Sequence, residues 1–298
     1  MKIAILGGGA WGRALATLAA EAGSNPHIGY RSAPVRGFPG SPNLSGIARE
    51  HEVIFIAVPP AAVRTVVQQA KLGPEHRVII AARGIEPQTG TWLSKIVLEE
   101  SSALRVGALA GPALADEVLK GNPTAMVIGS AYEELTRLTQ HALHSRQCRI
   151  YSSKDLIGIE LAGAMVGALS LALGVVDGLN QGVGVRGVVV TRGIAEAIRL
   201  GQSLGAEEQS FTGLAGIGDL VSCGSLSSNS TYAAGRQLGS GRSCTEQHIQ
   251  ILKSILNLAK KQGVEIPLTS AIYAIAKGKL RPELALDMLM RREATAEY

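Results

Sequence analysis

Aromatic residues are scarce in this 298-residue chain: Phe, Trp and Tyr together make up 4 %, with 3 Phe and 2 Trp against 36 Gly. So few rings exclude a core built on aromatic packing. They also argue against a nucleic-acid surface, in which basic and aromatic side chains alternate. Hydrophobic residues still make up 46 % of the chain, so Ala, Leu and other aliphatic side chains supply the core. A chain this apolar is not disordered as a whole.

Cysteine is equally rare, and the three that occur, Cys148, Cys223 and Cys244, lie far apart. An odd, scattered set excludes a disulfide framework or a cysteine metal cluster and favours a reducing compartment. The six histidines share no metal-ligand spacing. The pair His141 and His144, three positions apart, fits a solvated helix face better than zinc. We therefore expect no metal.

Long apolar runs and targeting signals are also absent. The longest uncharged stretch, Leu161 to Val176, is shorter than the roughly 20 residues of a membrane span, so it predicts a buried helix. The formal charge of +5, from 29 basic and 24 acidic residues, is mild and scattered. An anionic small molecule accounts for this charge more simply than nucleic acid. We expect a cytoplasmic protein with a small-molecule substrate and no membrane span.

Strand and helix signals alternate in the first half of the chain. Apolar runs at Lys2–Leu6, Val53–Val58, Val78–Ala82, Val106–Ala110 and Thr124–Ile128 are separated by helical patterns such as Ala10–Ala22. This alternation predicts an α/β Rossmann-type, doubly wound parallel sheet over residues 1–155. From about residue 156 the chain lacks strand signals, and helical patterns at Val188–Leu204, Thr245–Lys261 and Ala271–Lys279 predict an all-α second domain, 156–298.

Gly7, Gly9 and Gly12 form G-x-G-x-x-G directly after the first predicted strand and at the start of the first predicted helix. In a dinucleotide fold the first glycine makes a tight turn and the second lets the backbone approach the pyrophosphate. The third lets helix and strand pack closely. The alternative is a glycine-rich turn without a ligand.

The end of the second predicted strand bears on the choice of cofactor. NAD-binding loops place an acid about 20 residues after the glycines, where it binds the ribose 2′-hydroxyl. Here the strand ends in Tyr30-Arg31-Ser32, without an acid, and Arg31 suits a 2′-phosphate. NADP is therefore favoured over NAD, unless Arg31 is only solvated or stacks on the adenine.

Several segments together resemble the bacterial NAD(P)-dependent glycerol-3-phosphate dehydrogenases. They are GGGAWGRALA (7–16), ARGIE (82–86), AGPALADEV (110–118), GNPTAM (121–126), DLIGIELAG (155–163) and FTGLAGIGDL (211–220). The resemblance covers roughly residues 2–275. It implies hydride transfer between a nicotinamide and the C2 position of glycerol 3-phosphate or dihydroxyacetone phosphate, and a homodimer.

The resemblance also implies the residues of the site. The positions that match cofactor-binding positions are Gly7, Gly9, Ala10, Trp11, Gly12, Arg31, Arg83, Ala115, Ser228 and Gln250. The positions that match substrate-binding positions are Gly111, Ala113, Asp219, Ser227 and Asn229. Arg83 and Asp219 are the candidate catalytic residues.

The sequence departs from the family pattern where substrate chemistry is concentrated. Arg83 replaces a lysine; it keeps the charge but cannot exchange a proton near neutral pH, because its pKa lies above about 12. Val166 stands where the family has its proton-accepting lysine, and valine has no titratable group. Ser228 and Ser230 replace two phosphate-binding arginines.

Three hypotheses follow. The first is a glycerol-3-phosphate dehydrogenase-like oxidoreductase with weak or absent activity on that substrate. The second is a paralogue that reduces a less anionic carbonyl or imine, and the third is a non-catalytic NADP(H)-binding sensor or partner protein. Asp219 either has a raised pKa and donates a proton, or it only caps the following helix.

Overall fold

An eight-stranded sheet occupies the first half of the chain in the computed structural model, which describes residues 1–224 and 229–290. Its strands are β1 (Lys2–Leu6), β2 (Asn25–Gly29), β3 (Gly40–Ser41), β4 (Val53–Ile56), β5 (Arg77–Ile80), β6 (Arg105–Ala110), β7 (Thr124–Gly129) and β8 (Cys148–Ser153). Their order in the sheet is β3-β2-β1-β4-β5-β6-β7-β8. From β1 the strands follow one another towards one edge of the sheet, as far as β3. From β4 they follow one another towards the other edge, as far as β8, as in a doubly wound fold.

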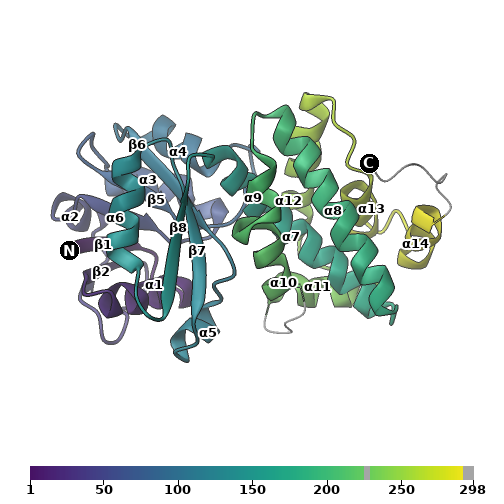
Figure 1. Cartoon of the computed structure of the whole chain (residues 1–298), viewed down its shortest axis with the longest axis horizontal. Helices are drawn as coiled ribbons and strands as arrows, with labels where there is room; N and C mark the ends of the chain where they lie inside the picture. Colours follow the sequence, from purple (N-terminus) through teal and green to yellow (C-terminus); the bar gives the residue numbers. More distant parts are fainter. Residues whose placement is uncertain (225–228, 291–298) are drawn as a thin grey trace.

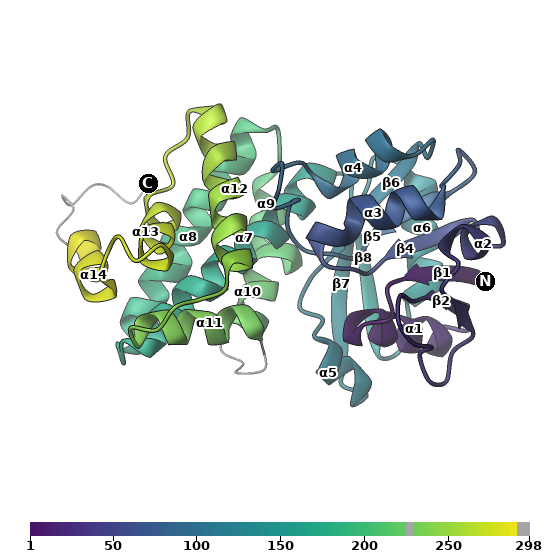
Figure 2. The ribbon, with the colours of Figure 1, turned by 180° about the vertical axis from the view of Figure 1, so that it is seen from behind.

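Helices cover both faces of this sheet (Figures 1 and 2). The helices of this half are α1 (Ala10–Glu21), α2 (Leu44–Arg49), α3 (Pro60–Ala70), α4 (Leu93–Glu100), α5 (Ala115–Leu119) and α6 (Glu133–Leu143). One buried cluster joins the sheet to α1 and α6, and a second joins its other face to α2, α3 and α4. Because both faces are covered, the central strands are apolar without alternation.

One pairing departs from the predicted parallel sheet. β6 and β7 are antiparallel, with Leu109 opposite Ile128, whereas β7 and β8 are parallel. The connection from β6 to β7 holds only the five-residue α5, which is too short for a crossover that returns the chain in the same direction. The prediction of a doubly wound parallel sheet is confirmed for the sheet as a whole, which is mostly parallel, and β6 with β7 is the antiparallel pair among the described strands.

The second half is helical, as expected. Its elements are α7 (Leu156–Gly178), α8 (Val183–Ser203), α9 (Glu208–Thr212), a π-helical turn (Leu214–Gly218), α10 (Asp219–Cys223), α11 (Ser230–Gly239), α12 (Glu246–Gln262), α13 (Pro267–Ala276) and α14 (Pro282–Met290). Among the described helices, α7 alone is long and apolar enough to cross a membrane, but 94 % of its most apolar window is buried. The other helices surround α7, so its apolar surface serves as the domain core.

Glycines let α7 and α11 touch backbone to backbone. A Cβ on Gly174 would lie 2.2 Å from the Tyr232 carbonyl oxygen, and a Cβ on Gly235 would lie 2.1 Å from the Leu171 oxygen. Real Cβ atoms do not approach so closely, so these positions accept only glycine unless the helices separate. This contact explains part of the high glycine content and fixes α11 beside the central helix.

A buried carboxyl links the two halves of the molecule. Glu160, on α7, accepts hydrogen bonds from the backbone N–H of Ser94, at 2.9 Å, and from the Ser94 hydroxyl, at the start of α4. Burial raises the pKa of Glu160 to about 7, although both Ser94 hydrogen bonds favour the ionised form. The contact between the helical domain and the sheet domain therefore includes a buried carboxyl group, that of Glu160, which is costly to ionise.

This link predicts a pH-dependent stability. The folded-state pKa of about 7 exceeds the ordinary value of 4.5, so the folded protein binds more protons and its stability falls as pH rises from about 4.5 to 7. The fall attributable to Glu160 is about 3 kcal/mol at most. We expect Glu160→Gln, which keeps an acceptor for the Ser94 N–H, to flatten this slope in urea unfolding at pH 4.5 to 8. The exposed Glu133→Gln is the control; equal slopes in the Glu160 variant and the parent would contradict the assignment.

Candidate functional site

The three motif glycines differ in what surrounds them. Gly7 follows β1 with φ of +133°, and a Cβ there would meet the Ala57 oxygen at 2.3 Å. A Cβ on Gly12 would lie 1.8 Å from the Gly7 oxygen, whereas a Cβ on Gly9 would have no atom of the described residues within 4 Å. Gly7 and Gly12 are thus required by packing within the protein, and Gly9 borders open space.

The start of α1 offers free backbone donors at this open space. Gly9 is the N-cap residue, no side chain caps the helix, and its first turn holds no acid. Its first N–H groups are therefore available to an anion, which the helix dipole also favours. The loop lies where β1 sits between β2 and β4, the point at which open α/β sheets bind ligands. These features fit the pyrophosphate of a dinucleotide.

A cleft of about 530 Å³ runs along the carboxyl ends of the central strands. Trp11 lines it, and its Nε1–H donates to the Ala81 oxygen at 2.8 Å, which ties the glycine loop to the end of β5. We call this space the cofactor-side cleft; the predicted residues among those lining it are Gly9, Ala10, Trp11, Arg83, Gly111, Ala113 and Ala115. Seven predicted positions from three segments of the chain thus meet at one place.

A second cavity of about 440 Å³ adjoins the first and is bounded by α5, α7 and the start of α11. We call it the α7-side cavity. Five residues line both spaces: Ala10, Arg83, Leu114, Ala115 and Ser230. Arg83, with one third of its side chain exposed, is therefore the charged group at the junction.

Three contacts hold the Arg83 guanidinium. Its Nη2 lies 2.8 Å from Asp219 Oδ1 and donates to the Gly111 oxygen at 3.3 Å, and its Nη1 donates to Cys223 Sγ at 3.2 Å. The Cys223 thiol in turn donates to Asp219 Oδ1 at 3.2 Å. Burial raises the pKa of Cys223 to about 12, so this thiol is a neutral packing group and not a nucleophile.

Asp219 sits behind Arg83 and is fully buried. Burial raises the pKa of its carboxyl to about 6, with the Arg83 charge and the Cys223 hydrogen bond acting in the opposite direction. Its side chain does not cap α10, so the capping alternative is wrong, and Oδ2 has no hydrogen-bond partner among the described residues. Asp219 lines neither space; its contact with them runs through Arg83, which lines both.

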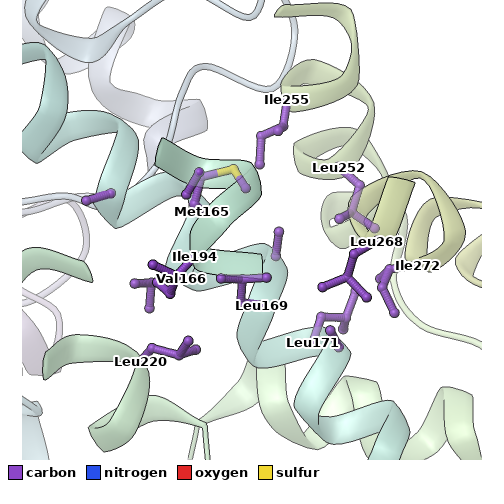
Figure 3. Close-up of a cluster of buried hydrophobic side chains, with 14 of the residues drawn as sticks. Met165, Val166, Leu169, Leu171, Ile194, Leu220, Leu252, Ile255, Leu268 and Ile272 are labelled. Atoms are coloured by element: carbon purple, nitrogen blue, oxygen red, sulfur yellow. The ribbon is translucent and has the colours of Figure 1, made fainter. Parts of the chain in front are cut away.

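Val166 lines the α7-side cavity although it is only 2 % exposed. Figure 3 shows it in the buried apolar cluster with Met165, Leu169 and Ile194. Among the described residues that line this cavity, Arg83 is the only cation, and Asp116 and Glu117 are carboxylates. The lysine expected from the family pattern has no charged substitute here in the described part of the chain.

The start of α11 supplies polar groups to the same cavity. Asn229 Oδ1 accepts from the N–H groups of Thr231 and Tyr232, each at 3.0 Å, which leaves its amide NH₂ as a donor. Asn229, Ser230 and Thr231 all line the α7-side cavity. The predicted Ser227 and Ser228 lie outside the described residues.

Sequence reasoning missed Ser170. It lies on α7, one turn after Val166, and lines the α7-side cavity. Its buried hydroxyl has no hydrogen-bond partner in the described ranges, so it is available to a ligand. The sequence did contain a signal for it. Ser170 is a lone hydroxyl-bearing residue on an apolar helix, and because it lies four positions after Val166 it shares the same helix face.

Four of the described cofactor residues predicted from the sequence line neither space: Gly7 and Gly12, which are packed inside the protein, and Arg31 and Gln250. Arg31 is exposed after β2 and lines neither. Gln250, on α12, donates to Glu246 Oε1 at 2.7 Å, and its neighbour Ile251 lines the α7-side cavity instead. The structure thus places Arg31 at the strand end where a ribose is expected, and it gives Gln250 a partner on its own helix.

Comparison with known proteins finds similar sequences over both domains. Residues 39–136 match the family described as NAD-dependent glycerol-3-phosphate dehydrogenase N-terminus, and residues 155–287 match the corresponding C-terminus. The glycerol-3-phosphate dehydrogenase [NAD(P)+] of Ralstonia nicotianae is 35 % identical, with 100 % of this chain and 99 % of that protein covered. That of Nostoc sp. is 32 % identical over 99 % and 98 %.

Solved structures give the same result. The crystal structure of glycerol-3-phosphate dehydrogenase from Coxiella burnetii superposes with a TM-score of 0.90 at 27 % identity, covering 98 % of this chain and 99 % of that one. A ketopantoate reductase from Ralstonia eutropha shares the fold, with a TM-score of 0.63 at 15 % identity. Each of the two structures covers 98 % of this chain, so the structural similarity extends over both domains.

The environment of Gly9 yields a direct test of the cofactor-side cleft. We expect Gly9→Ala to leave the melting temperature unchanged, because its Cβ meets no protein atom, and to weaken NADPH binding at least tenfold, or about 1.4 kcal/mol, because it occupies the pyrophosphate space. Fluorescence titration measures the affinity. Gly187→Ala, also in open space but on α8, is the matched control and should bind normally. Unchanged affinity in Gly9→Ala would place the cofactor elsewhere.

Proposed function

We propose a function from the premise that this chain belongs to the NAD-dependent glycerol-3-phosphate dehydrogenase family. It is a glycerol-3-phosphate dehydrogenase-like oxidoreductase whose relatives use NAD or NADP. A dinucleotide bound in the cofactor-side cleft would supply or accept a hydride. The α7-side cavity, next to it and sharing Arg83, would hold a small carbonyl or alcohol.

Arg83 is the group that would act on the reacting oxygen. It reaches both spaces, and a fixed guanidinium stabilises negative charge that develops on a carbonyl oxygen during reduction. Its proton does not leave near neutral pH, so it cannot serve as the acid or base. Asp219 is buried behind it and holds the guanidinium in place, which makes Asp219 a positioning residue.

We propose that turnover of dihydroxyacetone phosphate and glycerol 3-phosphate is weak or absent. The observation that supports this is Val166, an apolar residue on the wall of the substrate space where the family pattern has lysine. A missing general acid or base typically lowers the rate about 10² to 10⁴ fold. The single cation and two carboxylates of the described cavity wall also suit a phosphate ester poorly.

The test is a paired measurement on the purified protein: NADPH and NADH binding, then oxidation of each with dihydroxyacetone phosphate. We expect binding, with kcat at least about 10²-fold below the ordinary 1 to 10³ per second. Val166→Lys returns an amine to the cavity and should raise kcat at least tenfold. Val166→Met adds comparable length without an amine and should not. Ordinary turnover in the unmodified protein would disprove the proposal.

A second candidate is a paralogue that acts on a less anionic carbonyl or imine. The charge balance of the α7-side cavity favours it, as do the unpaired Ser170 hydroxyl and the Asn229 amide, which suit a neutral polar substrate. NADPH oxidation with a panel of uncharged carbonyls and imines separates the candidates. Binding without turnover on any of them would support the sensor or partner protein instead.

We also propose a preference for NADP over NAD. The supporting observation is the position of Arg31, exposed directly after β2 beside the glycine loop, with Tyr30 and Ser32 as neighbours and no acid at the strand end. An arginine there binds a 2′-phosphate with charge-assisted hydrogen bonds.

The affinity ratio tests this preference. We expect Arg31→Ala to weaken NADPH binding about tenfold or more, since a hydrogen bond to a charged group contributes about 1.5–3 kcal/mol, and to change NADH binding little. Arg36→Ala, also exposed and basic in the same connection, is the control. An equal loss for both cofactors would refute the preference and assign Arg31 to the adenine or the fold.

Family membership further supports a homodimer and a cytoplasmic location as proposals. Val183 and Val188, at the start of α8, are 86 % and 47 % exposed. A second copy of the chain would bury this apolar surface.

A further inference from the structure

Two histidines and a glutamate meet on the sheet face covered by α2 and α3. His27 lies in β2 opposite Ala4, whose side chain belongs to the buried cluster of that face. Glu50 and His51 follow the last turn of α2. One ring nitrogen of each histidine and one carboxylate oxygen of Glu50 all lie within 4.8 Å of one another, and the two rings are 4.5 Å apart between centroids.

The ring of His51 is held in the orientation and the tautomer that a metal ligand needs. Its Nδ1 lies 2.8 Å from the Ile47 carbonyl oxygen. A carbonyl only accepts hydrogen bonds, so Nδ1 carries the proton and Nε2 presents a lone pair. The residue is 3 % exposed, and Nε2 has no hydrogen-bond partner in the described part of the chain. Metal-binding histidines commonly show this arrangement, with the second nitrogen bonded to a backbone carbonyl.

The other two groups complete a donor set. His27 is half-buried in β2, and its ring lies against that of His51, 4.5 Å away between centroids. Glu50 is exposed and free to reorient its carboxylate. Two imidazoles and one carboxylate, with water in the remaining position, are a set that zinc and neighbouring transition metals accept.

We propose that His27, Glu50 and His51 bind a divalent transition-metal ion, with Zn²⁺ as the reference ion. Tetrahedral zinc, with bonds of about 2.0–2.2 Å, needs ligand atoms roughly 3.4 Å apart, which the exposed Glu50 and half-buried His27 reach by side-chain rotation. The ion would tie β2 to the connection between α2 and β4. His27 lies 23 and 24 positions before Glu50 and His51, which is why the sequence spacing gives no metal motif.

This site is separate from the proposed catalytic one. His27 pairs with the middle of β1, whereas the glycine loop and the cofactor-side cleft lie beyond the carboxyl ends of the strands. None of the three ligands lines either of the two spaces. The ion would therefore stabilise the sheet domain without contacting cofactor or substrate.

The test uses the full chain after removal of metal with EDTA. We expect calorimetric titration with zinc chloride to give one site and the melting temperature to rise with zinc, because an ion that binds the folded state stabilises it. His27→Gln and His51→Gln should each weaken binding more than the 10–100-fold seen when a metal site loses an outer hydrogen bond. If His51→Gln does not fold, His27→Gln and Glu50→Gln carry the test, since Glu50 is exposed and His27 is only half-buried.

His141→Gln removes a surface histidine outside the cluster and should bind zinc like the parent. Substitution of cobalt(II) adds a spectroscopic check: nitrogen and oxygen ligands give visible d–d bands without the charge-transfer band of a thiolate. No zinc binding, equal affinity in the parent and both histidine variants, or a thiolate band would each overturn the site.

Discussion

The ion pair between Arg83 and Asp219 determines the character of the site. Asp219 comes from the helical domain and Arg83 from the end of β5, so the pair also joins the two domains. A fully buried carboxylate is costly unless it is paired, and the guanidinium offsets that cost. In return, Asp219, Gly111 and Cys223 fix the guanidinium at the junction of the two spaces. The same pairing neutralises part of its charge, so Arg83 attracts an anionic substrate less than a free cation would.

The sequence was informative where local pattern decides structure. The glycine motif, the apolar strands and the change to helices near residue 156 all depend on neighbours along the chain, and all appear as predicted. The antiparallel β7 depends on the length of one connection, which strand patterns do not reveal. The π-helical turn at Leu214–Gly218 places Asp219 next to Arg83, and no local sequence pattern predicts such a turn. The pairing of His27 with His51 arises only when β2 packs under α2.

The two halves of the site differ in what they are made of. The cofactor-side cleft is built mainly from backbone: the glycine turn, the start of α1 and the strand ends. Any sequence that keeps the fold and these glycines keeps that surface. The α7-side cavity depends on side chains for its charge, and those can change without refolding the chain.

Val166 shows why such a change is tolerated. α7 is buried on nearly every side, so a lysine at this position must keep its ammonium out of an apolar cluster and in contact with solvent or a partner. Valine has no such requirement and packs with its neighbours, so an apolar residue here is compatible with stability, but it offers the α7-side cavity no group that could transfer a proton.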